Sequence, residues 1–262
     1  MSNNSGAGYP SLCHRLYAVW YRHYRVYTKN LLSNGLPPFL EPLIFLAGIG
    51  LGMGKYVSEM NGMPYLEYLA SGLPLSAAMF TAAFECSFGT FIRLEFDRVY
   101  DGMLAAPITV GNLLAGEILW AGTKGLFFST AVILVVSCFG LLPMPVSLLA
   151  SAIGFVTGCM FAALSLLVTS FVKTINHFNF YFTGFISPMF FFSGIVFPLE
   201  NLPAAMRYAA EIFPLTHSIR LMRAIVYGQW HPVLLADAAF VLVFTLVIGF
   251  FAIRRLRKRL IV

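Results

Sequence analysis

Six long apolar stretches constrain this 262-residue chain more than any other feature of its sequence. They lie near residues 36–54, 68–90, 113–139, 146–170, 178–198 and 233–253. The hydrocarbon core of a bilayer is about 30 Å thick and needs roughly 20 apolar residues per helix, so each stretch can cross it. Because the core holds no water to pair exposed backbone groups, a spanning segment must be a helix. We therefore predict an all-α, polytopic membrane protein with six transmembrane helices.

The composition agrees with this prediction. Hydrophobic residues make up 59% of the chain and charged residues 11%, whereas ordinary soluble domains carry about 25% charged residues. The six stretches and their connections use nearly all of residues 11–262, so we expect one membrane domain there, preceded by a short disordered tail over residues 1–10. The four cysteines are dispersed, and we predict neither a disulfide framework nor a metal site.

The net charge of +6 has a distribution that orients the chain in a membrane. Twelve of the 17 lysines and arginines precede the first stretch, follow the sixth, or lie between stretches two and three or four and five. Cytoplasmic connections carry the excess of basic residues in membrane proteins, so both termini are expected in the cytoplasm. The positive charge also favours anionic lipid headgroups, and we expect no nucleic-acid partner.

Residues 11–30 form the first informative segment outside the apolar stretches. At helical spacing an apolar face that includes Trp20 and Tyr27 opposes a basic face made of Arg15, Arg22, Arg25 and Lys29. A helix with this division lies flat at the membrane surface. It is either a simple anchor or a mechanical element that touches a cytoplasmic partner.

The connection 91–112 is the second such segment. Five charges of mixed sign fall within nine positions, with apolar side chains between them and Pro107 near the end. The charged residues are Arg93, Glu95, Asp97, Arg98 and Asp101, and the apolar ones include Phe96 and Met103. A short amphipathic helix of this kind suits docking onto a soluble protein, although charged turns between spans are also common.

The stretch 199–232 is too long for a turn and unusually apolar for a solvated loop. Pro203, Pro214 and Pro232 divide it into pieces, each too short to span a membrane. We predict re-entrant helices on the extracytoplasmic side, between the fifth and sixth spans, because irregular backbone at membrane depth is tolerated where it lines a cavity.

Three ionisable residues fall inside the predicted spans: Glu85 in the second, and Glu117 and Lys124 in the third. A charge at that depth is costly, so it is expected to have a partner. At 1.5 Å per residue Glu85 and Lys124 lie roughly 12 and 18 Å from the shared connection, a difference that a lysine side chain can cover. We predict a Glu85–Lys124 contact with Glu117 nearby. The group is structural, lines the substrate passage, or relays protons.

Motifs for catalysis are not found, and we predict no catalytic residue. The glycines at 48, 50, 52 and 54 precede Lys55, but a phosphate loop needs a different spacing after a soluble strand, and close packing of helices explains them better. An intramembrane enzyme would need a polar catalytic cluster, which the sequence lacks. A chain with two docking segments and no nucleotide site fits a transporter that uses ATP hydrolysed by another protein.

Three sequence elements resemble a known family. Gly102 to Lys124 reads GMLAAPITVGNLLAGEILWAGTK, Ser187 to Pro203 reads SPMFFFSGIVFPLENLP, and Phe213 to Arg223 reads FPLTHSIRLMR. These elements resemble the permease subunits of ABC-2 type transporters, and are similar to those of the nodulation protein J branch. The likeness extends from about residue 17 to the C-terminus.

The resemblance implies a homodimer in the bacterial inner membrane that binds two copies of a cytoplasmic ATPase subunit. ATP and Mg²⁺ would be bound by that subunit, and this chain would bind no cofactor. The helix at 11–30, with Arg15, Trp20, Arg22 and Arg25, would be the interface helix. The segment 91–106 would be the coupling helix, contacting the ATPase through Arg93, Glu95, Phe96, Asp97, Arg98, Asp101 and Met103. Members of the nodulation branch are associated with export of lipid-linked chitooligosaccharides.

The fifth stretch is rich in aromatic side chains, which stack on sugar rings or line a path for acyl chains. Pro188 also removes a backbone hydrogen bond from it, which makes this helix the expected flexible one. We assign the substrate path to Phe178, Phe182, Phe185, Pro188 and Phe192. The expected substrate is an amphiphile of the lipooligosaccharide or glycolipid kind. The alternatives are a hydrophobic drug or antibiotic, or ion-coupled transport that uses Glu85, Glu117 and Lys124.

Overall fold

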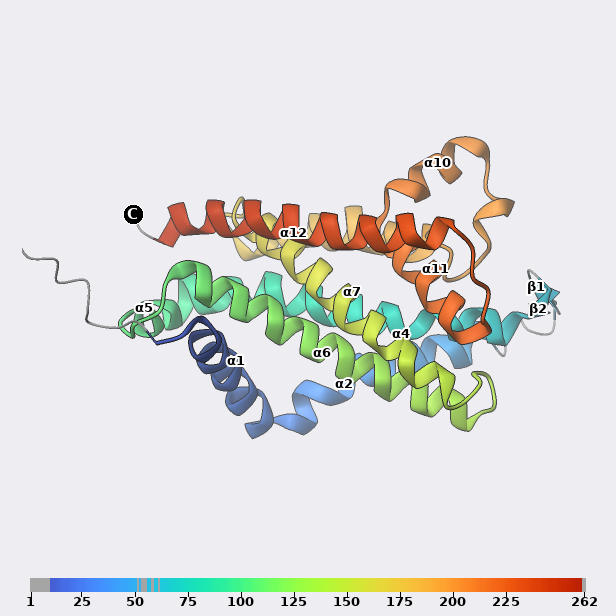
Figure 1. Cartoon of the computed structure of the whole chain (residues 1–262), viewed down its shortest axis with the longest axis horizontal. Coiled ribbons are helices and arrows are strands. Elements are labelled where there is room, and N and C mark those ends of the chain that lie inside the picture. The colour runs from blue at the N-terminus through green and yellow to red at the C-terminus, as the bar shows by residue number, and fades with distance from the viewer. Residues whose placement is uncertain (1–9, 51, 53–55, 58, 61, 261–262) are drawn as a thin grey trace, which may run out of the picture.

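The computed structural model describes residues 10–50, 52, 56–57, 59–60 and 62–260. Residues 1–9 of the predicted tail, Lys55 and part of the first apolar stretch lie outside the described residues. The described chain is an elongated helical bundle, and α4, α6, α7 and α12 run along its length (Figure 1). One small antiparallel pair, β1 (Glu59–Met60) with β2 (Met63–Pro64), is the exception to an all-α fold within this part of the chain.

The helices follow one another in this order: α1 (Leu12–Lys29), α2 (Leu31–Phe45), η1 (Leu46–Gly50), α4 (Tyr65–Phe84), η2 (Glu85–Gly89), η3 (Ile92–Phe96), α5 (Val99–Leu104), α6 (Val110–Cys138), α7 (Val146–Thr169), η4 (Ile175–His177), α8 (Phe178–Tyr181), η5 (Phe182–Ile186), α9 (Ser187–Phe192), η6 (Leu199–Asn201), α10 (Ala204–Ile212), α11 (Pro214–Tyr227) and α12 (Val233–Leu260). Of the short segments, η1, η2, η3 and η5 are π-helical, and η4 and η6 are 3₁₀-helical.

Four helical segments are long and apolar enough to cross a membrane: Tyr65–Phe96, Val110–Cys138, Val146–Thr169 and Val233–Leu260. They correspond to the second, third, fourth and sixth predicted spans. The first predicted span falls on α2 and η1, and partly on residues outside the described set. The protein is therefore an all-α membrane protein with several long apolar helices.

The fifth predicted span, 178–198, is divided and shorter than expected. Its helical part, α8, η5 and α9, stops at Phe192, and Gly194 then adopts a left-handed conformation with φ of +88°. Pro188 has no N–H to donate and is the second residue after the π-helical turn η5. A π-helical turn accommodates a local break in the hydrogen-bond ladder of a helix. The helix ends early because a residue with positive φ cannot continue it.

Small residues allow α6 and α7 to approach closely at the centre of the bundle. A Cβ atom added to Gly125 would lie 2.6 Å from the carbonyl oxygen of Gly154, and one added to Gly154 would lie 2.4 Å from Cβ of Ser129. Gly158 meets the same surface one turn further along α7, where an added Cβ atom would lie 3.0 Å from Gly122 Cα. Packing by small residues four apart is the usual way in which helices associate in lipid, where burial of apolar surface gives no driving force.

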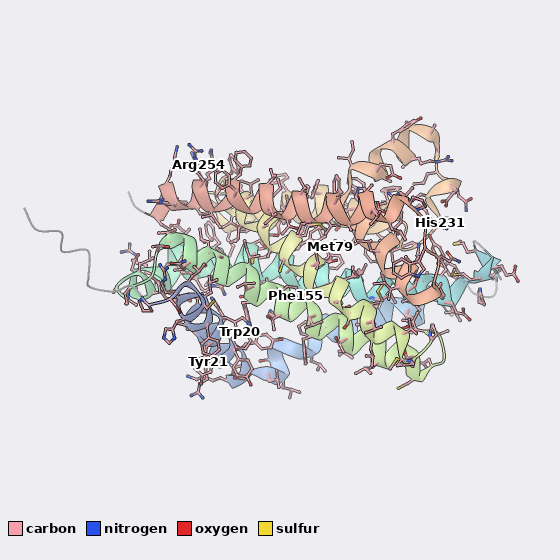
Figure 2. All side chains as sticks on the ribbon, in the orientation of Figure 1. Trp20, Tyr21, Met79, Phe155, His231 and Arg254 are labelled. Carbon is pink, nitrogen blue, oxygen red and sulfur yellow. The ribbon has the colours of Figure 1, made fainter. Side chains whose placement is uncertain are left out.

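The two ends of the bundle differ in their elements (Figure 1). The helices α1 and α5 and the C-terminal end of α12 gather at one end, whereas α10, α11 and the β1–β2 pair lie at the other. Arg254 and His231 mark these two ends in Figure 2. The N-terminal helix and the C-terminal basic residues therefore share one end of the molecule.

The segment 199–232 contains two short helices with different surroundings. Helix α11 is inserted into the bundle, and most of its side chains are buried against α4, α7 and α12. Helix α10 projects from the bundle, and Ala210 is its one buried residue. The apolar side chains of Met206 and Ile212 in α10 are consequently exposed.

Candidate functional site: a buried ion cluster beside a phenylalanine-lined cavity

Four charged side chains meet where α4 and its π-helical extension lie against α6. Glu85 is the first residue of η2, Arg93 lies in η3, and Glu117 and Lys124 lie two turns apart on α6. We call these four residues the ion cluster. Glu117 is completely buried, and Glu85, Arg93 and Lys124 are largely buried.

Arg93 is the centre of the ion cluster, because its guanidinium joins both carboxylates. Its Nη1 donates to Glu85 Oε1 at 2.8 Å and its Nη2 to Glu117 Oε2 at 2.7 Å. Lys124 Nζ donates to the other oxygen of Glu85 at 2.9 Å. A buried charge is tolerated when an opposite charge and hydrogen bonds compensate its lost hydration, and this arrangement supplies both.

Side chains from three further segments complete the coordination of Glu117. Tyr100 on α5 donates its hydroxyl hydrogen to Glu117 Oε1 at 2.7 Å, and Thr90, between η2 and η3, donates to Oε2 at 3.0 Å. His23 Nε2 on α1 lies 3.1 Å from Oε1. Burial, and then the nearby Glu117 carboxylate, raise the pKa of Tyr100 well above its ordinary value, so its hydroxyl remains a neutral donor.

The π-helical turns explain how Glu85 and Arg93 come together. In η2 the N–H of Thr90 donates to the carbonyl oxygen of Glu85, five residues earlier, and Arg93 Nη2 donates to the same oxygen at 3.2 Å. Such π-helical turns are rare in proteins overall, and a large share of them lie at functional sites. The chain then leaves α4 through Arg98, whose φ of 47° is the one positive φ among the described residues other than glycine.

The predicted contact between Glu85 and Lys124 is present, with Glu117 nearby. Arg93 differs from its expected place: the sequence assigns it to a surface that contacts the ATPase, but its side chain extends from η3 into the ion cluster. The physical reason is that the two buried carboxylates would otherwise share one cation, Lys124, and a buried charge without compensation is costly.

The other predicted coupling residues lie at the surface around α5. Phe96, Asp97, Arg98 and Asp101 are exposed and Met103 is half-buried. We call the exposed part of residues 95–103 the docking segment, after the role that the sequence predicts for it. Glu95 is exposed too, and it accepts a hydrogen bond from Arg259 Nη2 at 2.7 Å, which ties the docking segment to the end of α12.

Helix α1 packs against α6 through residues of its predicted apolar face. Val19 is buried against Gly116, where an added Cβ atom would lie 2.5 Å from Val19 Cγ1. Trp20 donates from Nε1 to Thr123 Oγ1 at 3.0 Å. Arg15, from the predicted basic face, also reaches α6 and donates to Asn112 Oδ1 at 2.9 Å.

The predicted basic face of α1 is only partly turned to solvent. Arg22 is half-buried and Arg25 is exposed. The ammonium group of Lys124 lies over the ring of Tyr27, near the C-terminal end of the helix, at 4.7 Å from the centroid of that ring. Burial, with a smaller effect of Glu85, raises the pKa of Tyr27 to about 12. Helix α1 therefore contacts the ion cluster at His23 and at Tyr27.

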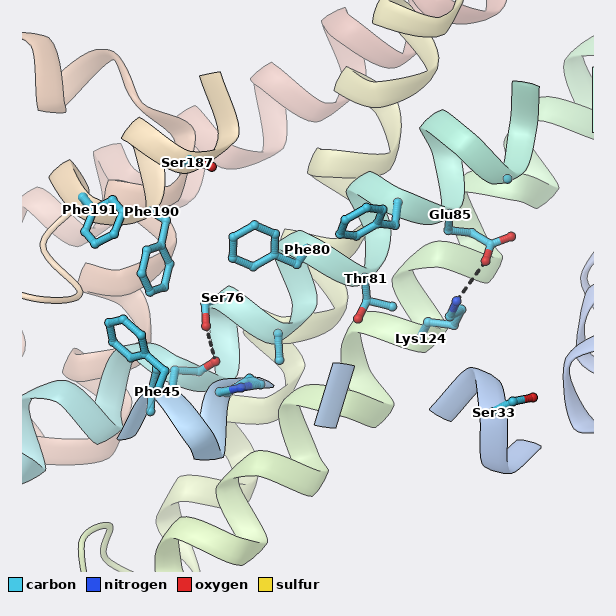
Figure 3. Close-up of a pocket in the computed structure, with 15 residues that line it drawn as sticks. Ser33, Phe45, Ser76, Phe80, Thr81, Glu85, Lys124, Ser187, Phe190 and Phe191 are labelled. Atoms are coloured by element: carbon cyan, nitrogen blue, oxygen red, sulfur yellow. Dashed lines mark hydrogen bonds and ion pairs between the residues drawn. The ribbon is translucent and has the colours of Figure 1, made fainter. Parts of the chain in front are cut away.

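A cavity of about 670 Å³ adjoins the ion cluster (Figure 3). Glu85 and Lys124 stand at one end of it, joined by their ion pair, and phenylalanine side chains from α2, α4 and α9 line much of the rest, together with residues such as Ser76 and Thr81. The phenylalanines are Phe45, Phe80, Phe84, Phe190 and Phe191. We call this the phenylalanine cavity. It combines a long apolar wall with one charged end, which suits an amphiphilic molecule.

The residues predicted for the substrate path are near this cavity but do not line it. Phe178 is fully buried, with its ring 5.0 Å from that of Phe88, and Phe182 stacks on Phe84 at 4.3 Å. Phe185 packs against Tyr181 and Phe213, and Phe192 packs against Phe197. Pro188 lies between the cavity-lining residues Ser187 and Phe190. The fifth apolar stretch thus lines the cavity through Ser187, Phe190 and Phe191, and not through the predicted residues. The rotation of the helix about its axis decides which of its side chains face the cavity.

Sequence reasoning missed the contributions of His23, Thr90 and Tyr100 to the ion cluster. None of them stands out as a charge in an apolar run, and their positions depend on how α1 and α5 fold back on α6. Asp237, which is buried in α12, was missed as well, although a carboxylate within the sixth apolar stretch was a visible signal.

Comparisons with known proteins agree with the resemblance in the sequence. Residues 14–227 match the family model described as ABC-2 type transporter. The chain is 37% identical to nodulation protein J of Sinorhizobium fredii over 206 residues, which is 79% of each chain. It is 36% identical to nodulation protein J of Rhizobium leguminosarum bv. trifolii over 233 residues, 89% of this chain and 88% of that one. It is 20% identical to the inner membrane transport permease YadH of Escherichia coli over 78% of this chain and 79% of that one.

Proposed function

Since this chain belongs to the ABC-2 type transporter family, as its non-catalytic membrane permease component, we propose that it exports an amphiphile across the bacterial inner membrane. The favoured substrate class is a lipooligosaccharide or glycolipid, and nodulation protein J at 30–37% identity is the relative that suggests it. Permeases of this family pair with an ABC ATPase, so ATP and Mg²⁺ would be bound there.

The phenylalanine cavity is the observation that carries the substrate class. Its wall of five phenylalanines suits an acyl chain, because apolar side chains contact such a chain by van der Waals packing and require no polar group from it. Its charged end suits a polar headgroup that hydrogen-bonds without a net charge, since Glu85 and Lys124 already neutralise one another. A hydrophobic drug or antibiotic would use the same wall but would leave the charged end without a function.

The ion cluster argues for a structural role of Glu85, Glu117 and Lys124. Each carboxylate oxygen of Glu85 and Glu117 has a partner within 3.1 Å. An ion-coupled transporter needs a site that can release and rebind its ion, whereas breaking this cluster would leave a buried charge without compensation. We therefore infer that the cluster joins α1, α4, α5 and α6 into one unit.

The proposed assembly is a homodimer with two ATPase subunits, six spans in each permease chain and both termini in the cytoplasm. The docking segment and α1 share one end of the bundle with the basic end of α12, which suits a cytoplasmic face. Tyr100 links α5 directly to Glu117, so a push on the docking segment would reach the helices beside the cavity.

Vesicles that contain the chain and its ATPase subunit test the proposal with a fluorescent short-chain glycolipid as cargo. We expect ATP-dependent transport, and a loss of about tenfold for Phe80→Ala at unchanged ATPase binding, because the mutation removes one wall of the cavity. Phe180→Ala is the matched control, since Phe180 is 80% exposed and away from the cavity. Transport by the chain alone, driven by an ion gradient, would refute the proposal.

The docking segment has a separate test. Charge reversal by Asp101→Lys should abolish capture of the ATPase subunit by the purified permease without altering membrane insertion. Glu59→Lys, an exposed acid at the opposite end of the molecule, should leave capture unchanged. Normal capture by the Asp101 variant, together with that of Asp97→Lys, would show that the ATPase docks elsewhere.

A further inference from the structure

A second cavity, of about 390 Å³ and with six charged residues in its lining, lies at the end of the bundle opposite the ion cluster. It is formed by α10, α11, the beginning of α12 and the neighbouring ends of α4 and α9, near His231 in Figure 2. We call it the outer pocket. Its charged side chains are three arginines, Arg207, Arg220 and Arg223, and three carboxylates, Glu200, Glu211 and Asp237.

One wall of the outer pocket is held in place by neutral groups. The Arg223 guanidinium lies 3.8 Å from the ring centroid of Tyr68 and donates from Nε to Ser71 Oγ at 2.9 Å. Tyr68 in turn donates its hydroxyl hydrogen to the carbonyl oxygen of Gly194 at 2.8 Å. Arg207 Nη2 donates to the carbonyl oxygen of Glu200 at 2.7 Å, and Arg223 Nη2 to that of Tyr68 at 3.2 Å. Within the described part of the chain no carboxylate lies within 4.0 Å of either guanidinium, and since each has five N–H donors, both keep hydrogen-bonding capacity for a ligand.

The opposite wall contains a buried carboxylate with an unused oxygen. Asp237 is 1% exposed, and His217 Nδ1 lies 2.6 Å from its Oδ1. Arg220 Nε is 3.7 Å from the same oxygen, and Arg220 also pairs with Glu211. Asp237 Oδ2 is buried without a hydrogen-bond partner among the described residues. A buried acceptor of this kind is costly unless a donor satisfies it.

The mixture of donors and acceptors determines which ligand fits. An inorganic anion would meet three carboxylates, and a metal cation would meet three arginines. A hydroxyl group donates to carboxylates and accepts from guanidiniums, so several hydroxyls on one ring satisfy both walls at once. The volume is near the lower end of the range for small-molecule sites, about 300–1,000 Å³.

We propose that the outer pocket binds a sugar ring, as a site for the saccharide headgroup of the exported amphiphile on the far side of the membrane. The assignment rests on the proposed function, which supplies such a headgroup and places this end of the bundle outside the cytoplasm. Asp237 and Glu211 accept from the hydroxyls of the ring, and Arg207 and Arg223 donate to them.

Equilibrium binding of fluorescent chitotetraose to the full-length chain in lipid nanodiscs tests this site. Asp237→Asn should weaken binding by about tenfold, as expected for the loss of a hydrogen bond to a charged group. Arg207→Gln should weaken it by about threefold, and because Arg207 is exposed this variant decides the question if Asp237→Asn does not fold. Glu59→Gln and Arg254→Gln are matched controls, both exposed and outside the pocket, and should bind as the unmodified chain does.

Three results would overturn the assignment. They are a lack of binding by the unmodified chain, binding by both pocket variants that is as tight as that of the unmodified chain, and displacement of the probe by inorganic phosphate when an unlabelled neutral sugar does not displace it. Transport in vesicles is read separately. If chitotetraose binding depends on Asp237 and Arg207 but no glycolipid is exported, the proposed function fails while the sugar site stands.

Discussion

The ion cluster and the outer pocket are both built from arginines and carboxylates, but they differ in how these groups are satisfied. In the ion cluster each carboxylate oxygen has a partner, and Arg93 bridges two buried acids. In the outer pocket Asp237 keeps an unpartnered oxygen, and two arginines contact only neutral groups among the described residues. The first arrangement is closed, which fits the structural role that we propose for it, whereas the second has groups left over for a ligand.

The largest expected effect follows from opening the closed site. Arg93→Met removes the cation between two buried carboxylates and should lower the free energy of unfolding by about 3–5 kcal/mol, because an uncompensated buried charge remains. Denaturant unfolding of the purified chain in detergent measures it. Arg98→Gln, exposed in the same connection, should change stability by less than about 0.5 kcal/mol. A mild effect of Arg93→Met would show that water enters the cluster and that it is not closed.

This contrast also explains what could be predicted from the sequence. A charged residue inside an apolar stretch is easily recognised in a sequence, as Glu85, Glu117 and Lys124 were. The spacing of these residues along two helices was enough to predict the contact between Glu85 and Lys124. Asp237 obeys the same rule and could have been found by it. The partners His23 and Tyr100 could not, because their approach depends on the angles at which α1 and α5 return to α6.

The fold shows the same division between local and non-local information. Hydrophobic length predicts the second, third, fourth and sixth spans, since each is one continuous helix. The fifth was overestimated, because length alone does not reveal that Gly194 takes a positive φ and ends the helix. The assignment of the substrate path to Phe178 and Phe182 likewise depends on which face of the helix is turned to the cavity. The π-helical turn η5 shifts that face, and the period of an ordinary α-helix does not predict the shift.

A smaller effect is expected where the cluster meets the docking segment. Tyr100→Phe removes one hydrogen bond to Glu117 and should cost about 1.5 kcal/mol of stability, since the carboxylate keeps its bonds to Arg93 and Thr90. ATPase binding should be unchanged, but transport per ATP hydrolysed should fall, because α5 is no longer tied to α6. Tyr208→Phe, on an exposed tyrosine of α10, serves as the control. Unchanged coupling in the Tyr100 variant would mean that motion reaches the membrane helices by another contact.

The smallest effects distinguish an exposed ion pair from the buried ones. Glu95→Gln removes an exposed partner of Arg259 and should cost less than about 1 kcal/mol, and 1 M salt should abolish the difference because exposed charges are screened. Arg259→Gln should cost more, about 1–2 kcal/mol, since Arg259 also donates to the carbonyl oxygens of Thr169 and Val172 at the end of α7, each at 2.8 Å. Unfolding measured for both variants at low and high salt separates the two contributions. Equal losses of stability in the two variants would show that Arg259 acts through Glu95 alone. The end of α12 would then be held by an ion pair to the docking segment and not by hydrogen bonds to the carbonyl oxygens of α7.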